Sequence, residues 1–312
     1  MNLLIQYTFV FAAVLIMVAL GGMFSERSGV INIGLEGIMV FGALGGAMTL
    51  HLLPENFPGV LTVIFTLLAS AAAGLLSSLL LAVACINFKA DQTLAGTALN
   101  MIAPAAATVL VKAYNMNAIG KSSPEITYYA QRQPFLFNIG GVEFSWFIVV
   151  AIVLFAVAAV VLYKTRFGLR LRSCGEHPQA ADSVGINVYK MRYAGVLISG
   201  ALGGIGGIIY IAAVNSSWRF DMGVAGAGFL ALAVMIFGQW KPGRIALSGL
   251  LFALFLALSN VYGAFPALKN LGINGSFYTM LPYIVSLVVL AFTSKKSRAP
   301  KAEGVPYDKG MR

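Results

Sequence analysis

GGMFSERSGVINIGLEGIMVFGALGG, residues 21–46, joins two long apolar runs near the start of the chain. Glycines occur throughout this stretch, and its charged and amide residues are Glu26, Arg27, Asn32 and Glu36. Membrane proteins use glycine and polar residues in this way where the backbone leaves the regular helix to line a cavity. The stretch therefore predicts that a membrane helix is interrupted here.

The overall composition is that of an integral membrane protein. Of the 312 residues, 59% are hydrophobic and 10% are charged, whereas soluble domains carry about 25% charged residues. The net charge is +10, but the basic residues concentrate beside apolar runs, where membrane topology explains them better than nucleic-acid binding does. The sequence has two cysteines, and no group of residues has the spacing of a metal site or a catalytic set. We therefore expect neither a nucleic-acid-binding protein nor an enzyme.

Nine apolar runs are candidates for membrane-spanning helices, each of which needs about 20 apolar residues. The runs are residues 3–23, 30–53, 60–86, 93–111, 144–163, 193–214, 224–237, 245–262 and 279–292. They predict an all-α, polytopic membrane protein with roughly eight to ten transmembrane helices. One of these helices is expected to be broken or re-entrant near residues 24–37, and residues 1–294 are expected to form a single transmembrane domain.

The basic residues predict the orientation in the membrane. Residues 164–192 and residues 295–312 each contain six Lys or Arg residues. Because Lys and Arg are retained in cytoplasmic loops, both segments are assigned to the cytoplasm. The second segment is predicted to be a basic tail that is disordered beyond its first residues. Counting spans backward places Glu26 and Arg27 on the cytoplasmic side and the polar loop 112–143 outside.

Small residues predict close packing between helices. Two overlapping G-x-x-x-G pairs occur at Gly200, Gly203, Gly204 and Gly207. Such pairs allow two helix backbones to approach closely. The sequence GALGG also occurs twice, at 42–46 and at 200–204. The recurrence is either a trace of an internal repeat or a chance match in a chain rich in glycine and alanine.

A second informative stretch lies in the basic loop, where residues 175–185 read GEHPQAADSVG. Pro178 suits the first position of a helix, and Gly185 suits the position just past its end. The stretch predicts a short, exposed cytoplasmic helix, which at about two turns is not stable alone. Its residues alone fit either a docking element for a partner protein or an ordinary loop between helices.

Three stretches together resemble the permease subunits of bacterial ABC importers. They are residues 21–46, residues 175–185 and the run GAGFLALAVMIFGQWKP at residues 226–242. The similarity is greatest to the branch that contains ribose-type sugar permeases and nucleoside permeases. Within that branch, residues 24–37 resemble guanosine-type nucleoside uptake permeases, and the resemblance as a whole extends over about residues 10–295.

The resemblance implies an import function in the bacterial cytoplasmic membrane. A permease of this kind translocates nucleosides that an extracytoplasmic substrate-binding lipoprotein delivers. Separate ATPase subunits bind ATP and magnesium, so this chain is expected to hold no cofactor. A second, different permease chain is also implied, which would make a heterodimeric core. The alternatives are a permease for ribose or another simple sugar and, on hydropathy alone, a secondary transporter.

The resemblance also gives the cytoplasmic helix a role. In these importers a short helix between two spans lies in a groove of the ATPase subunit and transmits its closure. The residues that match this coupling segment are Glu176, Pro178, Ala180, Ala181 and Gly185.

The polar residues of the interrupted stretch have two interpretations. Asn32 and Glu36 are four residues apart and would share one face if the backbone were helical there. They then form either a polar wall of the translocation path or, with Glu26 and Arg27, a buried structural network. Because Glu26 and Arg27 are placed near the cytoplasm, we assign them to a network at the inner end.

Three residues of other spans are further candidates for the path. Asn100 and Asn260 either line it or form hydrogen bonds between helices. Phe229 follows Gly226 and Gly228. Its ring is either available to stack on a base or packs against lipid or the protein core. We expect no metal site.

Overall fold

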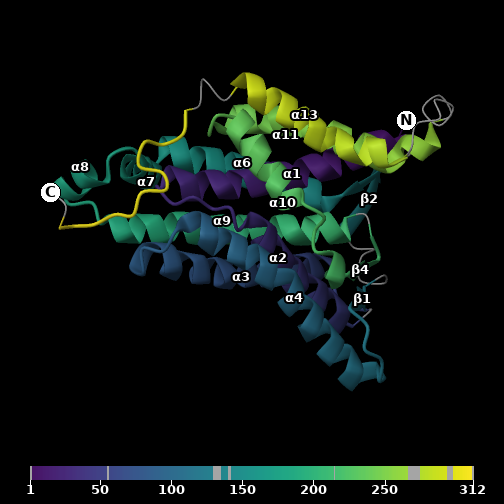
Figure 1. Cartoon of the computed structure of the whole chain (residues 1–312). Coiled ribbons are helices and arrows are strands. Elements are labelled where there is room, and N and C mark those ends of the chain that lie inside the picture. The colour runs from purple at the N-terminus through teal and green to yellow at the C-terminus, as the bar shows by residue number, and fades with distance from the viewer. Residues whose placement is uncertain are drawn as a thin grey trace.

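Long helices that pack side by side make up most of the molecule, as the computed structural model in Figure 1 shows. The structure describes residues 2–54, 56–128, 135–139, 142–213, 215–265, 275–293 and 298–310. Within these residues, seven helices are long and apolar enough to cross a membrane. They are α1 (Asn2–Arg27), α2 (Leu35–Leu52), α3 (Gly59–Ala82, continued by the π-helix Val83–Asn87), α4 (Gln92–Ile119), α6 (Trp146–Lys164), α9 (Val188–Ala212) and α11 (Pro242–Val261).

Two further helices complete the membrane part. Helix α13 (Gly275–Thr293) has 19 residues, as many as α6. Helix α10 (Ala227–Phe237) has 11 residues, which at 1.5 Å per residue is too short to cross a bilayer. The all-α, polytopic prediction is therefore confirmed, but the run 224–237 gives only a short helix.

Small polar residues cap the helices where they start at the membrane ends. The Asp91 side chain accepts a hydrogen bond from Leu94 N at 2.9 Å at the start of α4. The Asn187 side chain does the same for Lys190 N at 3.0 Å at the start of α9. These side chains satisfy backbone N–H groups that have no partner within the helix, so they fix where two of the spans begin.

Helix α9 lies at the centre and packs against α1, α2 and α3 (Figure 1). A side chain at Gly204 would place its Cβ 3.0 Å from Gly74 Cα of α3, so only glycine allows these backbones to come so close. From α3, Ser70 Oγ donates a hydrogen bond to Gly42 O of α2 at 2.7 Å. The two GALGG sequences thus lie in α2 and α9, which contact one another, and the close packing predicted from the glycines is confirmed.

The loops separate into two ends of the bundle, as the charge count predicted. At one end lie α7 (Arg166–Glu176), α8 (Pro178–Ser183) and the C-terminal segment (Figure 1). At the other end, β1 (Glu125–Thr127) pairs antiparallel with β4 (Ser217–Arg219). The segments assigned to the cytoplasm and those assigned to the outside are therefore collected at opposite ends.

Two details of the prediction were wrong. Helix α4 continues to Ile119, so the loop after it is shorter than the predicted loop 112–143. The tail was predicted to be disordered, yet residues 298–310 pack against the end of the bundle that holds α7 and α8, where Ala302 and Tyr307 are buried. The prediction failed because it used the charged composition of the whole segment. Composition does not show that two apolar side chains of the segment pack against the bundle.

Candidate substrate path and coupling site

The interruption near residues 24–37 is a turn between α1 and α2, and its first residues lie near α7. Helix α1 ends at Arg27 and α2 begins at Leu35. Ser25 holds the turn, because its backbone oxygen accepts from Ser28 N at 3.0 Å and its Oγ donates to Val30 O at 2.7 Å. The backbone leaves the helix here as predicted, but the segment is a turn between two candidate spans and not a break within one helix.

Asn32 lies in this turn, outside any helix, so the expectation that it shares a helix face with Glu36 is wrong. The hydrogen bonds of Ser25 explain why, because they end α1 before Asn32. Asn32 is fully buried, and its Nδ2 donates to Ser199 Oγ of α9 at 2.9 Å. Among the described residues its Oδ1 has no hydrogen-bond partner.

Glu36 connects the start of α2 to the start of α10. Its Oε1 accepts a hydrogen bond from Gly226 N at 2.8 Å, and its Oε2 accepts one from Gly228 N at 2.7 Å. A carboxylate at a helix N-terminus satisfies free N–H groups and interacts favourably with the helix dipole. Gly226 has φ +80°, a conformation that glycine adopts without strain. Glu36 therefore binds the interrupted backbone before α10 and takes no part in a network with Glu26.

Asn100 bonds between helices through both ends of its amide. Its Oδ1 accepts from Gly37 N at 2.8 Å, and its Nδ2 donates to Ile33 O at 2.9 Å. These bonds fix α4 against the turn and the first residues of α2. The cross-helix interpretation of Asn100 is thus the one that the geometry supports.

Phe229 and Asn260 remain the more exposed candidates. The Phe229 side chain is 48% exposed, at the start of α10. Asn260 is exposed and donates from Nδ2 to Leu256 O of its own helix at 2.8 Å. Tyr283 of α13, which the sequence analysis missed, donates from its hydroxyl to Ala225 O at 3.0 Å. A tyrosine beside Pro282 in an apolar helix is the signal that would have pointed to it.

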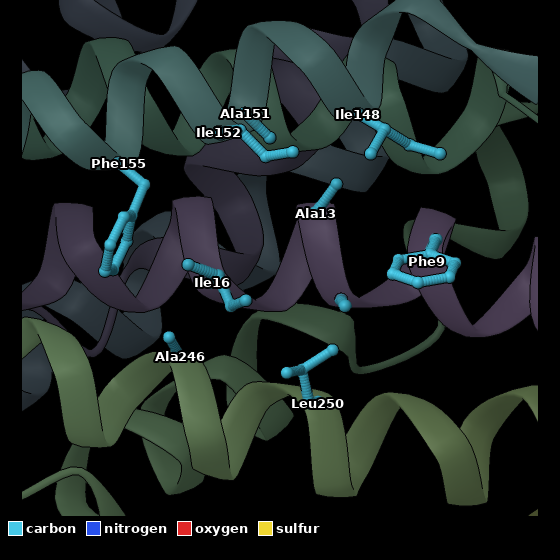
Figure 2. A pocket seen from close by; sticks show the side chains of 10 residues that line it. Phe9, Ala13, Ile16, Ile148, Ala151, Ile152, Phe155, Ala246 and Leu250 are labelled. Atoms are coloured by element: carbon cyan, nitrogen blue, oxygen red, sulfur yellow. The ribbon is translucent and has the colours of Figure 1, made fainter.

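The cavity in Figure 2 lies elsewhere, between α1, α6 and α11. Its volume is about 230 Å³, and apolar side chains such as Phe9, Ile16 and Phe155 line it. No path candidate is among its lining residues. A site for a hydroxylated substrate needs polar groups that fix its orientation, so this cavity is suited to lipid chains or to packing.

Glu26 and Arg27 both form hydrogen bonds with Trp240. The indole Nε1 of Trp240 donates to Glu26 Oε2 at 2.6 Å. Arg27 Nη2 donates to Trp240 O at 3.1 Å, and Arg27 Nη1 lies 3.3 Å from Glu176 Oε1. These bonds connect the end of α1 to α7 and to the turn between α10 and α11.

Replacing Trp240 with Phe is expected to destabilise the permease. The change leaves the buried Glu26 carboxyl without its indole donor, which costs about 1–3 kcal/mol. Thermal unfolding in detergent should show a midpoint that is lower by several degrees. The matched control is Trp146→Phe, because the Trp146 side chain is 47% exposed. Equal midpoints for the two variants would contradict the role given to the indole.

The short helix predicted in the basic loop is present as α8. Pro178 occupies its first turn, and Gly185 follows its end with φ +84°. Ala180 is exposed, whereas Ala181 is 3% exposed and packs inward. Glu176 ends α7 and makes the ion pair with Arg27. Of the five candidate coupling residues, Ala180 and Gly185 are therefore open to a partner.

A helical bundle with seven candidate spans among the described residues has the architecture of a polytopic membrane protein. Residues 4–292 match the family described as branched-chain amino acid transport system / permease component, and the chain belongs to this family. It is a transport component and a multi-pass protein of the cell membrane.

Individual relatives are similar over nearly their whole length. The nucleoside ABC transporter permease protein NupC of Lactococcus lactis is 42% identical over 99% of this chain and 98% of the relative. The guanosine ABC transporter permease protein NupQ of Bacillus subtilis is 42% identical over 100% of this chain and 98% of the relative. The putative glucose ABC transporter permease protein TsgC13 of Haloferax volcanii is 28% identical over 90% of this chain and 88% of the relative.

Proposed function

We propose that the chain is the permease subunit of an ATP-driven ABC importer that carries nucleosides across the bacterial cytoplasmic membrane. The observation that carries this proposal is the 42% identity, over almost the full length, to two permeases named for nucleosides or guanosine. The relative named for glucose is 28% identical. Because the chain is more similar to the permeases named for nucleosides than to the one named for glucose, we infer that its substrate contains both a sugar and a base.

The path is proposed to pass beside the start of α10. Glu36 and Asn100 shape its wall through backbone hydrogen bonds, and Asn32 fixes the turn behind it. The half-exposed ring of Phe229 is available to stack on a base, an interaction worth about 1–3 kcal/mol in nucleic-acid complexes. The exposed Asn260 adds a hydrogen-bonding amide.

Energy and substrate are proposed to come from separate subunits. ATPase subunits at the cytoplasmic end bind ATP and magnesium, and this chain holds neither. An extracytoplasmic lipoprotein delivers the substrate at the opposite end, and a second, different permease chain completes the core. The collection of basic segments at one end of the bundle supports this arrangement, because that end then faces the cytoplasm.

The ATPase is proposed to bind on α8. Replacing the exposed Ala180 with Leu should reduce copurification of the ATPase and lower uptake at least fivefold, because the longer side chain prevents close contact. The matched control is Ala156→Leu on α6, where an exposed alanine lies among exposed apolar residues. Normal ATPase binding and uptake in Ala180→Leu would contradict this role for α8.

The substrate class is tested by competition. Radiolabelled nucleoside uptake into cells that contain the complete importer should be blocked by excess unlabelled nucleoside and unaffected by excess ribose. Inhibition by ribose, together with poor inhibition by nucleoside, would favour the alternative of a simple-sugar permease.

A further inference from the structure

The C-terminal segment 298–310, here called the C-terminal strap, crosses the cytoplasmic end of the bundle. Figure 1 shows it as the yellow chain that passes beside α7 toward the start of α9. The match to the family ends at residue 292, so the strap lies outside the part of the chain that the family describes.

Polar contacts fix the strap to three parts of the bundle. Ala302 N donates to Gly175 O of α7 at 2.8 Å. Arg192 Nη1 of α9 donates to Val305 O at 2.9 Å. Asp308 pairs with Lys89, just before α4, at 2.7 Å, and this hydrogen bond holds the pKa of the Asp308 carboxyl below its usual value.

Tyr307 fastens the strap beneath α8. Its side chain is 4% exposed and packs in one cluster with Cys174 of α7, Ala181 of α8 and Val188 of α9. Its ring lies 5.2 Å from that of Tyr189, measured between centroids. The inward face of α8 therefore rests partly on the strap.

The strap also reaches the network at the inner end of α1. The Glu303 carboxyl shares a hydrogen bond with the Glu26 carboxyl and faces the charge of Arg27. Burial raises the pKa of Glu303. The strap therefore contacts both the residues packed under α8 and the end of α1.

Arg192 of α9 is buried where the C-terminal strap packs against the bundle. Its side chain is 1% exposed, and among the described residues its Nε and Nη2 have no hydrogen-bond partner. The strap carbonyl at Val305 supplies the acceptor for Nη1. Without the strap, both the guanidinium and the neighbouring cluster would be open to water.

We propose that the C-terminal strap is part of the coupling apparatus and transmits movement of α8, when the ATPase closes on it, to α1 and the turn after it. The proposal rests on the proposed docking of the ATPase on α8. A helix of six residues does not hold its shape alone. If α8 lacked a rigid support, a displacement would be absorbed locally and would not reach the membrane helices.

The two native cysteines provide a direct test of the support. Cys174 is fully buried in the Tyr307 cluster, and Cys85 is 1% exposed in a different cluster. Burial raises the pKa of the Cys174 thiol to about 11. Because both thiols are buried, neither should react with maleimide at neutral pH. In the assembled complex, Tyr307→Ala should increase labelling of Cys174 at least tenfold and leave Cys85 protected.

The matched control is Val305→Ala, because the Val305 side chain is 54% exposed and the variant keeps the carbonyl that Arg192 binds. This control should leave both cysteines protected. Truncation after residue 297 should reproduce the labelling pattern of Tyr307→Ala. Continued protection of Cys174 in both the truncated chain and Tyr307→Ala would overturn the proposal.

Transport by the same complexes tests the coupling step. We expect Tyr307→Ala and the truncation to retain the ATPase subunit on purification but to take up nucleoside at least fivefold more slowly, while Val305→Ala matches the wild type. Normal uptake in a variant whose Cys174 is exposed would show that the strap is dispensable for coupling. Absence of ATP-driven nucleoside uptake in the wild-type complex would instead count against the proposed function, and ATPase retention and cysteine labelling would still report on the strap.

Discussion

Replacing Gly204 with Val is expected to destabilise the permease strongly. A Cβ at this position would lie 3.0 Å from Gly74 Cα and in closer contact with Ser70 O. These atoms belong to the backbone of α3, so they cannot move aside as a flexible side chain would. Overpacking a core typically costs about 1–3 kcal/mol, and we expect a cost at or above the top of this range because α3 and α9 must separate.

The measurement is the yield of monodisperse protein on size-exclusion chromatography in detergent, together with its thermal unfolding midpoint. Gly243→Val is the matched control, because a Cβ at Gly243 has no atom within 4 Å. The Gly204 variant should aggregate or unfold at least 5 °C lower than this control. Similar yields and midpoints would contradict the close packing of α9 against α3.

Replacing Glu36 with Gln is expected to lower nucleoside uptake at least tenfold. The substitution keeps the shape but removes the charge, and it sets an NH₂ group against the N–H of Gly226 or Gly228. Hydrogen bonds to charged groups contribute about 1.5–3 kcal/mol each. The backbone before α10, where Ala225 has φ +53° and Gly226 φ +80°, would lose the anchor that maintains this conformation.

Uptake and thermal stability should be measured together for this variant. The matched control is Glu125→Gln, which changes an exposed carboxylate of β1 and should leave both properties unchanged. Wild-type uptake in Glu36→Gln would mean that the carboxylate is not needed to hold the start of α10.

The fold class and the two ends of the bundle were predictable from the sequence because both follow from composition. Apolar runs of spanning length required helices, and the separation of basic loops required alternate crossing. The glycines at 200–207 also indicated a close helix contact, because few other functions explain such spacing. These signals are local, and they do not depend on knowing which helices become neighbours.

The site was less predictable, because its contacts join residues that are far apart in the chain. Glu36 binds the backbone of Gly226 and Gly228, and no pattern around Glu36 specifies these partners. The helical spacing suggested for Asn32 failed because hydrogen bonds of the Ser25 hydroxyl and the Ser25 backbone oxygen close a turn first. Tyr283 was missed because its role depends on the irregular backbone at Ala225.

The strap was missed for a related reason. Its net composition is basic and polar, which is typical of a disordered tail. The strap binds a surface built from α7, α8 and α9. Ala302 and Tyr307 are buried there, and Val305 O accepts a hydrogen bond from Arg192. Composition averages over a segment, whereas docking is decided by a few positions.

The most direct test of the central claim is uptake of a radiolabelled nucleoside by proteoliposomes that contain the complete importer. The vesicles would hold this chain, its partner permease and the ATPase, with the binding protein added on the substrate side. Uptake should require ATP on the side of the membrane where the ATPase lies. It should be unaffected when ion gradients are collapsed. Uptake that persists without ATP and follows an ion gradient would contradict the account and identify a secondary transporter.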